Sequence, residues 1–266
     1  MVRCARLRTG VCRGDGDGMT DSAKYVVIAA LEREVAGLVT GWKPCRIEGL
    51  KSCWQRGEFA VVVVGMGWER AFLGTKVAVE AFHPELVTSI GFSGSLSTEL
   101  VVGDIFIPAQ VVGFKNGVAH TTGFGRGTLI TASGVVGVRE KAEMAGRYGA
   151  QAVDMEAAAV AEAAKANGAR FASLRAISDG VDDEMDFVGA FVTPEGFKAG
   201  AFLTHVAMRP RLWKALGKLA SNTTAATRSL TAALQSFISG PERYLTGDSK
   251  QHPPENVSGI GQSARK

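Results

Sequence analysis

Several signatures of common protein classes are missing from this sequence of 266 residues. No apolar run approaches the roughly 20 residues that span a bilayer, so we expect no integral membrane segment. Lysine and arginine are not interleaved with aromatic residues in any stripe, which argues against nucleic-acid binding. No glycine cluster at a strand end fits GxGxxG and no GxxxxGK[ST] occurs, which argues against dinucleotide-binding and P-loop proteins.

Cysteine is also scarce and carries no recognisable pattern. The four cysteines show no CxxC spacing, and two of them precede the globular pattern: Cys4, Cys12, Cys45 and Cys53. A disulfide framework or a structural metal site normally shows such a pattern. We therefore expect neither, and a reducing cytoplasm as the location.

Composition favours one globular domain. Hydrophobic residues make up 46% and charged residues 21% of the chain, and the net charge is a mild +4. Residues 1–22 are basic and rich in Gly and Asp, with Met19 as an alternative start, and residues 240–266 are polar with prolines. We predict disordered segments at 1–22 and 240–266 around a domain spanning 23–239.

Apolar runs alternate with helical patterns along this domain, which predicts a mainly parallel sheet covered on both faces. We expect a hairpin within 40–58 and a mobile loop at 113–127. Strands are predicted at 25–30, 60–64, 86–90, 103–114 as a pair, 129–131 and 171–179. Helices are predicted at 31–38, 68–82, 138–147, 157–166, 194–208, 210–219 and 224–237.

The sharpest functional signal is a β–α–β unit from Ala152 to Asp179. It places Glu156 at a helix start and Asp179 at the carboxyl end of a strand, where open α/β sheets bind ligands. Glu34 follows the first strand and adds a third acid at such a position. Alone, Glu156 could complement a helix dipole and Asp179 could cap a helix. Together, the three acids suit acid–base work on a polyhydroxylated substrate.

Glycines gather at three strand ends and allow a ligand to approach the backbone closely. They are Gly65 with Gly67, Gly91 with Gly94, and Gly180 after Ser178-Asp179. Ordinary turns between strands and helices would also explain each of these clusters.

Specific motifs resemble the purine nucleoside phosphorylase/uridine phosphorylase superfamily. VDMEAAAVAEAA with RAISD is the specific pair, supported in order by IAALEREV, VVGMG and SIGFSGSL…VVGDIFIPA, over about residues 24–203. The similarity is greatest to 5′-methylthioadenosine/S-adenosylhomocysteine nucleosidases. The resemblance implies a three-layer α/β/α sandwich with a central mixed sheet, a homo-oligomer, and cleavage of a purine nucleoside without a cofactor.

The resemblance also assigns roles. Asp179 would protonate the purine N7, with Ser178 orienting it, and Glu34 would activate the attacking water. Glu156 would hold the ribose hydroxyls and stabilise the oxocarbenium-like transition state. The other residues implied to bind substrate are Met155, Met66, Gly67, Phe92, Ser93 and Gly94. Arg175 is interpreted as structural.

Departures from the family pattern favour water over phosphate as the nucleophile. Phe92 replaces a serine that helps to hold the nucleophile, and Ser89 replaces a phosphate-binding arginine. The phosphate loop GDPxR is absent, which leaves Arg70 as the nearby cation for a dianion that favours Arg or Lys. Hydrolysis of a 5′-substituted adenosine is thus the leading hypothesis.

Two alternatives stay open. Phosphorolysis, with inorganic phosphate as co-substrate, includes the hopanoid-associated branch that cleaves an adenosyl lipid. Phe92 and the stretch 209–213 resemble that branch. A non-catalytic nucleoside-binding module is the second alternative, and the retention of all three acids argues against it.

Overall fold

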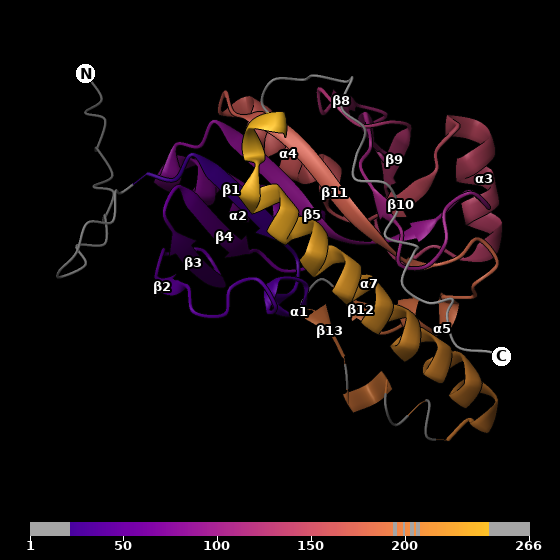
Figure 1. The fold of residues 1–266 in the computed structure, drawn as a ribbon. Coiled ribbons are helices and arrows are strands. Elements are labelled where there is room, and N and C mark those ends of the chain that lie inside the picture. Colours follow the sequence, from indigo (N-terminus) through magenta and orange to yellow (C-terminus); the bar gives the residue numbers. More distant parts are fainter. Residues whose placement is uncertain (1–21, 194–195, 199, 203–204, 206–207, 245–266) are drawn as a thin grey trace, which may run out of the picture.

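A computed structural model describes residues 22–193, 196–198, 200–202, 205 and 208–244 (Figure 1). Its main feature is an eleven-stranded mixed sheet. The segments predicted to be disordered lie outside the described residues at 1–21 and 245–266. The predicted tail is wrong at its beginning, because Pro241–Tyr244 forms a 3₁₀ turn and Pro241 is buried.

Long parallel strands form the centre of the sheet. β5 (Leu86–Ser95) pairs in parallel with β1 (Tyr25–Ala29) and with β11 (Arg170–Asp179), and β1 pairs in parallel with β4 (Phe59–Val63). All five residues of β1 are buried, as expected for an apolar strand covered on both faces. The parallel sheet predicted from these runs is confirmed. β5 continues to Ser95, beyond the predicted end at residue 90.

Shorter strands extend the sheet on both sides. The predicted hairpin is β2 (Lys43–Cys45) and β3 (Ser52–Arg56), and β3 pairs antiparallel with β4. On the other side β10 (Ala152–Asp154) joins the end of β5 to β9 (Thr128–Thr131). The remaining strands are β6 (Ile105–Phe106), β7 (Gln110–Gly113) and β8 (Ala119–Thr121). The 113–127 segment is therefore partly a strand, because β8 pairs with β7.

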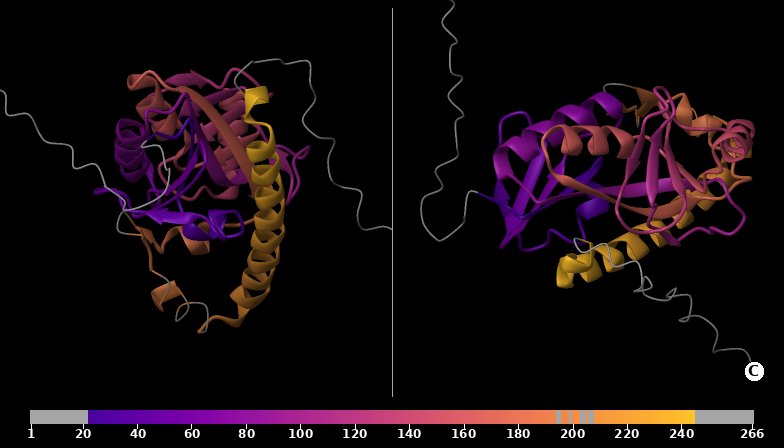
Figure 2. Two further views of the ribbon diagram at one scale, coloured as in Figure 1. Left: turned by 60° about the vertical axis from the view of Figure 1, so that its left-hand side comes forward. Right: turned by 90° about the horizontal axis from the view of Figure 1, so that it is seen from above.

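Helices cover both faces and produce three layers (Figure 2). On one face α2 (Trp68–Phe82) and α4 (Ala157–Ala166) pack together, and the small alanines of α4 permit this close approach. On the other face lie α1 (Glu32–Val35) and α7 (Trp213–Ser239). α3 (Val138–Tyr148) covers a third core cluster beside β9 and β10. The predicted α/β/α sandwich with a mixed sheet is confirmed.

The C-terminal part differs from the prediction. The helices expected at 210–219 and 224–237 are one 27-residue helix, α7, preceded by a 3₁₀ turn at Pro210–Leu212. No Gly or Pro interrupts residues 218–239, so nothing breaks the helix there. The helix expected at 194–208 is wrong at its beginning, where Gly196–Phe197 forms strand β13 and pairs with β12 (Val192–Thr193) after the short helix α5 (Asp186–Gly189). Residues 200–202 and 205 are helical. Part of the expected helix lies outside the described residues.

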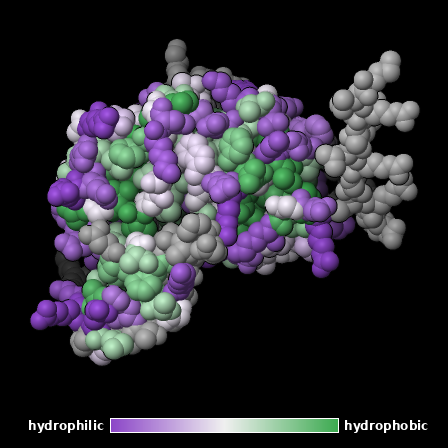
Figure 3. Space-filling view, turned by 180° about the vertical axis from the view of Figure 1, so that it is seen from behind, coloured by the Kyte–Doolittle hydropathy of each residue, from purple (hydrophilic) through white to green (hydrophobic). Residues whose placement is uncertain are grey.

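The beginning of α7 projects beyond the sheet (Figure 1). Seen from behind, this projecting end carries both hydrophobic and hydrophilic surface (Figure 3). Met208 and Trp213 are 76% and 59% exposed here.

The expectation of no disulfide is wrong. Cys45 and Cys53 face each other in the β2–β3 register and are joined by a disulfide. The hairpin brings them together, since antiparallel partners on one face lie within bonding reach.

Candidate active site

The predicted site residues gather at the carboxyl ends of β1, β4, β5 and β11. The backbone N–H of Gly67, which follows β4, donates a hydrogen bond of 2.8 Å to Glu156 Oε1. On the sheet, Gly94 of β5 pairs with both Val153 of β10 and Asp179 of β11. Strand pairing thus brings the glycine clusters and the DMEA and RAISD motifs to one edge.

The two oxygens of the buried Glu34 carboxyl group have different surroundings. It is 4% exposed, and its Oε2 accepts the N–H groups of Ala30 and Leu31 at 3.0 and 2.8 Å, which closes the start of α1. Its other oxygen, Oε1, is directed at Gly91: a β-carbon there would lie 3.0 Å from it. Burial raises the pKa of Glu34, an effect opposed by these N–H groups and by Arg175.

Arg175 and Asp154 form a buried ion pair beside these acids. The guanidinium donates to Asp154 Oδ2 from Nη2 at 2.6 Å and from Nε at 3.1 Å, and to Ser89 Oγ at 2.7 Å. Its Nη1 lies on the same side of Gly91 as Glu34, 3.3 Å from the position of a β-carbon there. Gly91 has φ +151°, so both the space and the backbone conformation require glycine.

Asp154, rather than Glu156, caps α4. Asp154 Oδ2 accepts the N–H of Ala157 at 2.8 Å, and Thr131 Oγ1 accepts that of Ala158 at 2.9 Å. The side chain of Glu156 makes no cap hydrogen bond and reaches Gly67 instead. The alternative in which Glu156 serves only the helix start is therefore not supported.

Glu34, Asp154, Glu156 and Arg175, here called the acid cluster, hold three carboxyl groups and one guanidinium. Burial and then the negative charge of Asp154, with a smaller contribution from Glu34, raise the pKa of Glu156 to about 8. The Gly67 N–H and Arg175 oppose this rise. An excess of buried negative charge favours a positive charge at this position, whether a proton or a cationic transition state.

Asp179 lies at the end of β11 and is 7% exposed. Its Oδ1 accepts a hydrogen bond of 2.8 Å from Ser178 Oγ, as the predicted orienting role requires. Its Oδ2 accepts one of 2.5 Å from Lys141 Nζ in α3. A β-carbon at Gly94 would lie 2.7 Å from the same oxygen, so the carboxyl group rests directly on β5. The pair of Asp179 and Lys141 is called the acid–lysine pair below.

The other predicted substrate-binding residues differ in their burial and in their contacts. Ser93 is buried, and its Oγ has no hydrogen-bond partner within the described part of the chain. Met66 and Met155 are half-buried next to Gly67 and Glu156. Phe92 packs against the core on the α7 face, with the Arg33 guanidinium 5.6 Å from its ring. Phe92 therefore contributes to the hydrophobic core.

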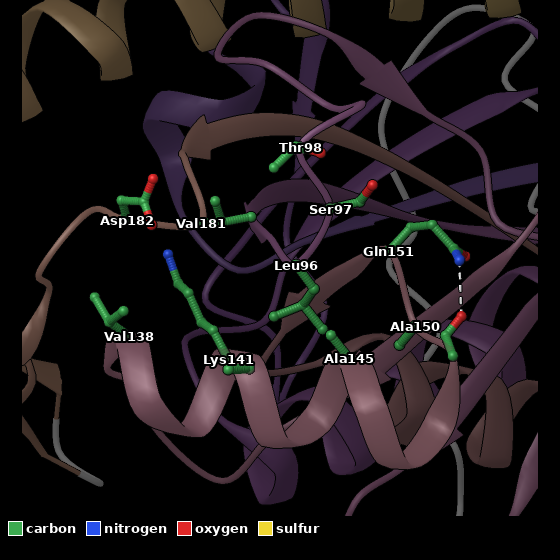
Figure 4. Close-up of a pocket in the computed structure, with 12 residues that line it drawn as sticks. Leu96, Ser97, Thr98, Val138, Lys141, Ala145, Ala150, Gln151, Val181 and Asp182 are labelled. Atoms are coloured by element: carbon green, nitrogen blue, oxygen red, sulfur yellow. Dashed lines mark hydrogen bonds between the residues drawn. The ribbon is translucent and has the colours of Figure 1, made fainter.

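Two cavities adjoin the acid–lysine pair. One of about 510 Å³ lies beside α3 and is shown in Figure 4, where Lys141 extends from α3 toward Val181 and Asp182. It contains none of the acid cluster. A smaller cavity of about 100 Å³ contains Asp179 and separates it from α7; Met185, Phe187 and Asn222 also line it. The smaller cavity therefore opens directly beside the carboxyl group of Asp179.

The sequence did not reveal that Lys141 and Asp154 belong to the site. It also did not reveal that Arg175 contacts Asp154 and lies beside Glu34. Asp154 stands inside the quoted DMEA motif, so its position could have drawn attention to it. Lys141 lies 38 residues before its partner Asp179, in a helix whose other charges are ordinary. No signal in the sequence could have identified it.

Comparison with known proteins agrees with this geometry. A model of the phosphorylase superfamily matches residues 118–207, which include the DMEA and RAISD motifs. A 5′-methylthioadenosine/S-adenosylhomocysteine nucleosidase of Marinomonas sp. is 30% identical over 105 residues, or 37% of this chain and 44% of that protein. Residues 118–207 of the chain are thus similar to the phosphorylase superfamily, and the relatives matched by sequence are nucleosidases. The matched segment spans less than half of that relative's length.

Solved structures of a nucleosidase and of a hydrolase share the fold. The apo 5′-methylthioadenosine nucleosidase of Arabidopsis thaliana has a TM-score of 0.62 and 18% identity, covering 83% of this chain and 96% of that one. The futalosine hydrolase of Helicobacter pylori has a TM-score of 0.55 and 18% identity, covering 77% and 97%. Among the residues that the structure describes, no helix is both long and apolar enough to cross a membrane.

Proposed function

We propose that this protein hydrolyses the N-glycosidic bond of a 5′-substituted adenosine and releases adenine. The observation that carries the proposal is the pairing of a cation-favouring acid cluster with a separate buried acid, Asp179, at one sheet edge. Cleavage of such a bond develops positive charge on the sugar and negative charge on the departing base. The two parts of the site match these two charges.

At the sugar, Glu156 would bind the ribose hydroxyls and stabilise the oxocarbenium-like carbon. Its hydrogen bond from Gly67 fixes its orientation before substrate arrives. Met155 and Met66 would pack against the ribose, and Ser93 Oγ is available as a hydrogen-bond donor. At the base, Asp179, oriented by Ser178, would deliver a proton to the purine N7.

Glu34 would accept a proton from the attacking water. Its Oε1 is not used by the N–H groups of Ala30 and Leu31, and it faces the same glycine, Gly91, as the Arg175 guanidinium. A carboxylate beside a guanidinium can orient water and take its proton. The proposed reaction needs water and no cofactor.

The same charges disfavour phosphate as the nucleophile. The guanidinium of Arg175 already donates to Asp154 and Ser89, and the acid cluster has more acids than cations. Arg70 is exposed and lies along Gly65, where a β-carbon would be 3.0 Å from its Cδ. A phosphate dianion would therefore meet buried carboxylates with one exposed arginine to offset them.

The decisive experiment measures adenine release from 5′-methylthioadenosine with and without inorganic phosphate, followed by product identification. Free methylthioribose without phosphate is the expected product. A ribose 1-phosphate that appears with phosphate alone would replace hydrolysis by phosphorolysis and assign Arg70 to phosphate. If no adenine is released in either condition, nucleosides with larger hydrophobic 5′ groups, as in an adenosyl lipid, would be tested next. Tight nucleoside binding without release from any of them would favour a binding module.

Assembly and location are further parts of the proposal. A homo-oligomer is proposed from the family resemblance and can be tested by sedimentation. A cytoplasmic location is proposed as well; the Cys45–Cys53 disulfide would then be one of the rare disulfides of that compartment.

A further inference from the structure

Lys141 is an unusual residue for a protein interior. Its side chain extends from α3 and the residue is 2% exposed; among the described residues, Lys141 and Arg175 are the two buried cations. Moving an ammonium group out of water costs several kcal/mol unless partners compensate for it. Its partners therefore account for its position.

Those partners belong to the end of β11. Lys141 Nζ donates to Asp179 Oδ2 at 2.5 Å and to the Gly180 carbonyl at 2.7 Å. Ser178 Oγ donates to the other Asp179 oxygen. Both oxygens of the acid are thus held, one by a hydroxyl and one by a charged group. The helix α3 contributes no residue to the acid cluster. The contact with Asp179 therefore comes from an element separate from those that build the cluster.

We propose that Lys141 is a positioning residue for leaving-group protonation, and that the acid–lysine pair holds the proton delivered to the purine. This inference rests on the proposed function. Protonation of the purine by a carboxyl group requires a proton that can reach that group. An ammonium group on Oδ2 gives the pair one transferable proton and a net charge of zero.

Proton transfer accompanies cleavage of the glycosidic bond. The C1′–N9 bond breaks and its electron pair goes to the purine. One proton passes from Lys141 Nζ to Asp179 and from Asp179 to N7, which leaves neutral adenine, a carboxylate and a neutral amine. The water oxygen bonds to C1′ and its proton goes to Glu34. The lysine regains a proton from solvent after adenine leaves, and Glu34 loses one.

A purely structural ion pair would hold α3 to β11 without affecting chemistry. A positioning role and a structural role of Lys141 predict different activities when Lys141 and Asp179 are substituted together. If Lys141 acts through Asp179, the loss of both groups should cost little more than the loss of Asp179, because residues that act as a unit are strongly non-additive. The ribose contacts do not involve Lys141, so KM should change little.

The experiment is a double-mutant cycle on the full chain with 5′-methylthioadenosine as the probe. Lys141→Met should lower kcat by about 100-fold, the lower range for loss of general-acid catalysis, with KM within about threefold. In an Asp179→Asn background, Lys141→Met should change kcat by less than about twofold. Lys141→Arg should restore part of kcat, because it returns a cation to Asp179.

The matched control is Lys218→Met. The exposed Lys218 binds Asp183, whose Oδ2 accepts the Gly180 N–H at 2.9 Å, so this change loosens the same loop without touching Asp179. Its kcat should stay within about threefold, as for a surface pair. Thermal unfolding checks each variant; should Lys141→Met not fold, Lys141→Gln, which keeps a donor for the Gly180 carbonyl, takes its place.

The outcomes separate the two proposals. Release by the wild type, together with a full extra loss from Lys141→Met in the Asp179→Asn background, overturns the role of Lys141 alone. So does an equal loss of kcat in Lys218→Met, which would assign the effect to the loop. No release by the wild type from any 5′-substituted adenosine overturns the proposed function and this inference with it.

Discussion

At the proposed ribose end, three carboxyl groups share one guanidinium, whereas at the leaving-group end one carboxylate has one ammonium. The acid cluster thus holds more carboxyl groups than cations, and the pKa of Glu156 is raised to about 8. The acid–lysine pair is balanced, with 2.5 Å between Asp179 Oδ2 and Lys141 Nζ. An unbalanced site can stabilise a developing cation, and the balanced pair holds one proton that can be transferred to the leaving group.

Removal of the acid at the leaving-group end should have the largest effect on catalysis. Asp179→Asn keeps the size of the side chain and should lower the rate of adenine release by about 10²–10⁴-fold, the range for general acid–base catalysis. Steady-state kinetics would measure the loss, with Ser178→Ala as a milder comparison. Turnover like that of the wild type in Asp179→Asn would remove the acid assignment.

Removal of the Arg175 guanidinium should affect the free energy of unfolding more than it affects catalysis. Arg175→Met leaves Asp154 buried without its charged partner and should cost about 3–5 kcal/mol of unfolding free energy. Denaturant unfolding would measure it. Adding Asp154→Asn to that variant should recover part of the loss, since it removes the unpaired charge. An unchanged midpoint in Arg175→Met would mean that solvent or another group compensates Asp154.

Removal of the cluster's central acid should lower turnover more than binding. Glu156→Gln should lower kcat by about 10²–10³-fold, the loss seen when one electrostatic stabiliser of a transition state is removed. KM should change little, because the partner of Glu156 is charge that develops during the reaction. If KM rises while kcat is kept, Glu156 is a ground-state contact.

The same variant should remove a pH dependence of stability. The pKa of Glu156 is about 8 in the folded protein and 4.5 ordinarily, so between these pH values the folded state holds a proton that the unfolded state lacks. Stability therefore falls as pH rises from 4.5 to 8, by at most about 1.4 kcal/mol per pH unit. Glu156→Gln should unfold at a higher temperature than the wild type at pH 8 and at a similar one at pH 5. Parallel melting curves at both pH values would contradict the raised pKa.

Local patterns explain how much of the fold was predictable. The apolar runs of β1, β4 and β11 and the helices α2 and α4 agree with the sequence within one residue at most ends. The β5 strand was cut short at Gly91, because glycine suggests a turn, yet β11 and β10 pair with the residues that follow it. The break expected within α7 was also wrong, because Ser, Asn and Thr residues do not end a helix whose apolar face is buried.

The sequence by itself determined the kind of site, because Glu34, Glu156 and Asp179 stand in motifs at strand ends and strand ends of a parallel sheet share one edge. Tertiary structure alone decided the charge of that site. It placed Asp154 beside Glu156 and Arg175 between Asp154 and Gly91, and it brought Lys141 from a separate helix to Asp179. Electrostatic interactions depend on distance and burial, and neither can be obtained from the spacing of residues along a chain.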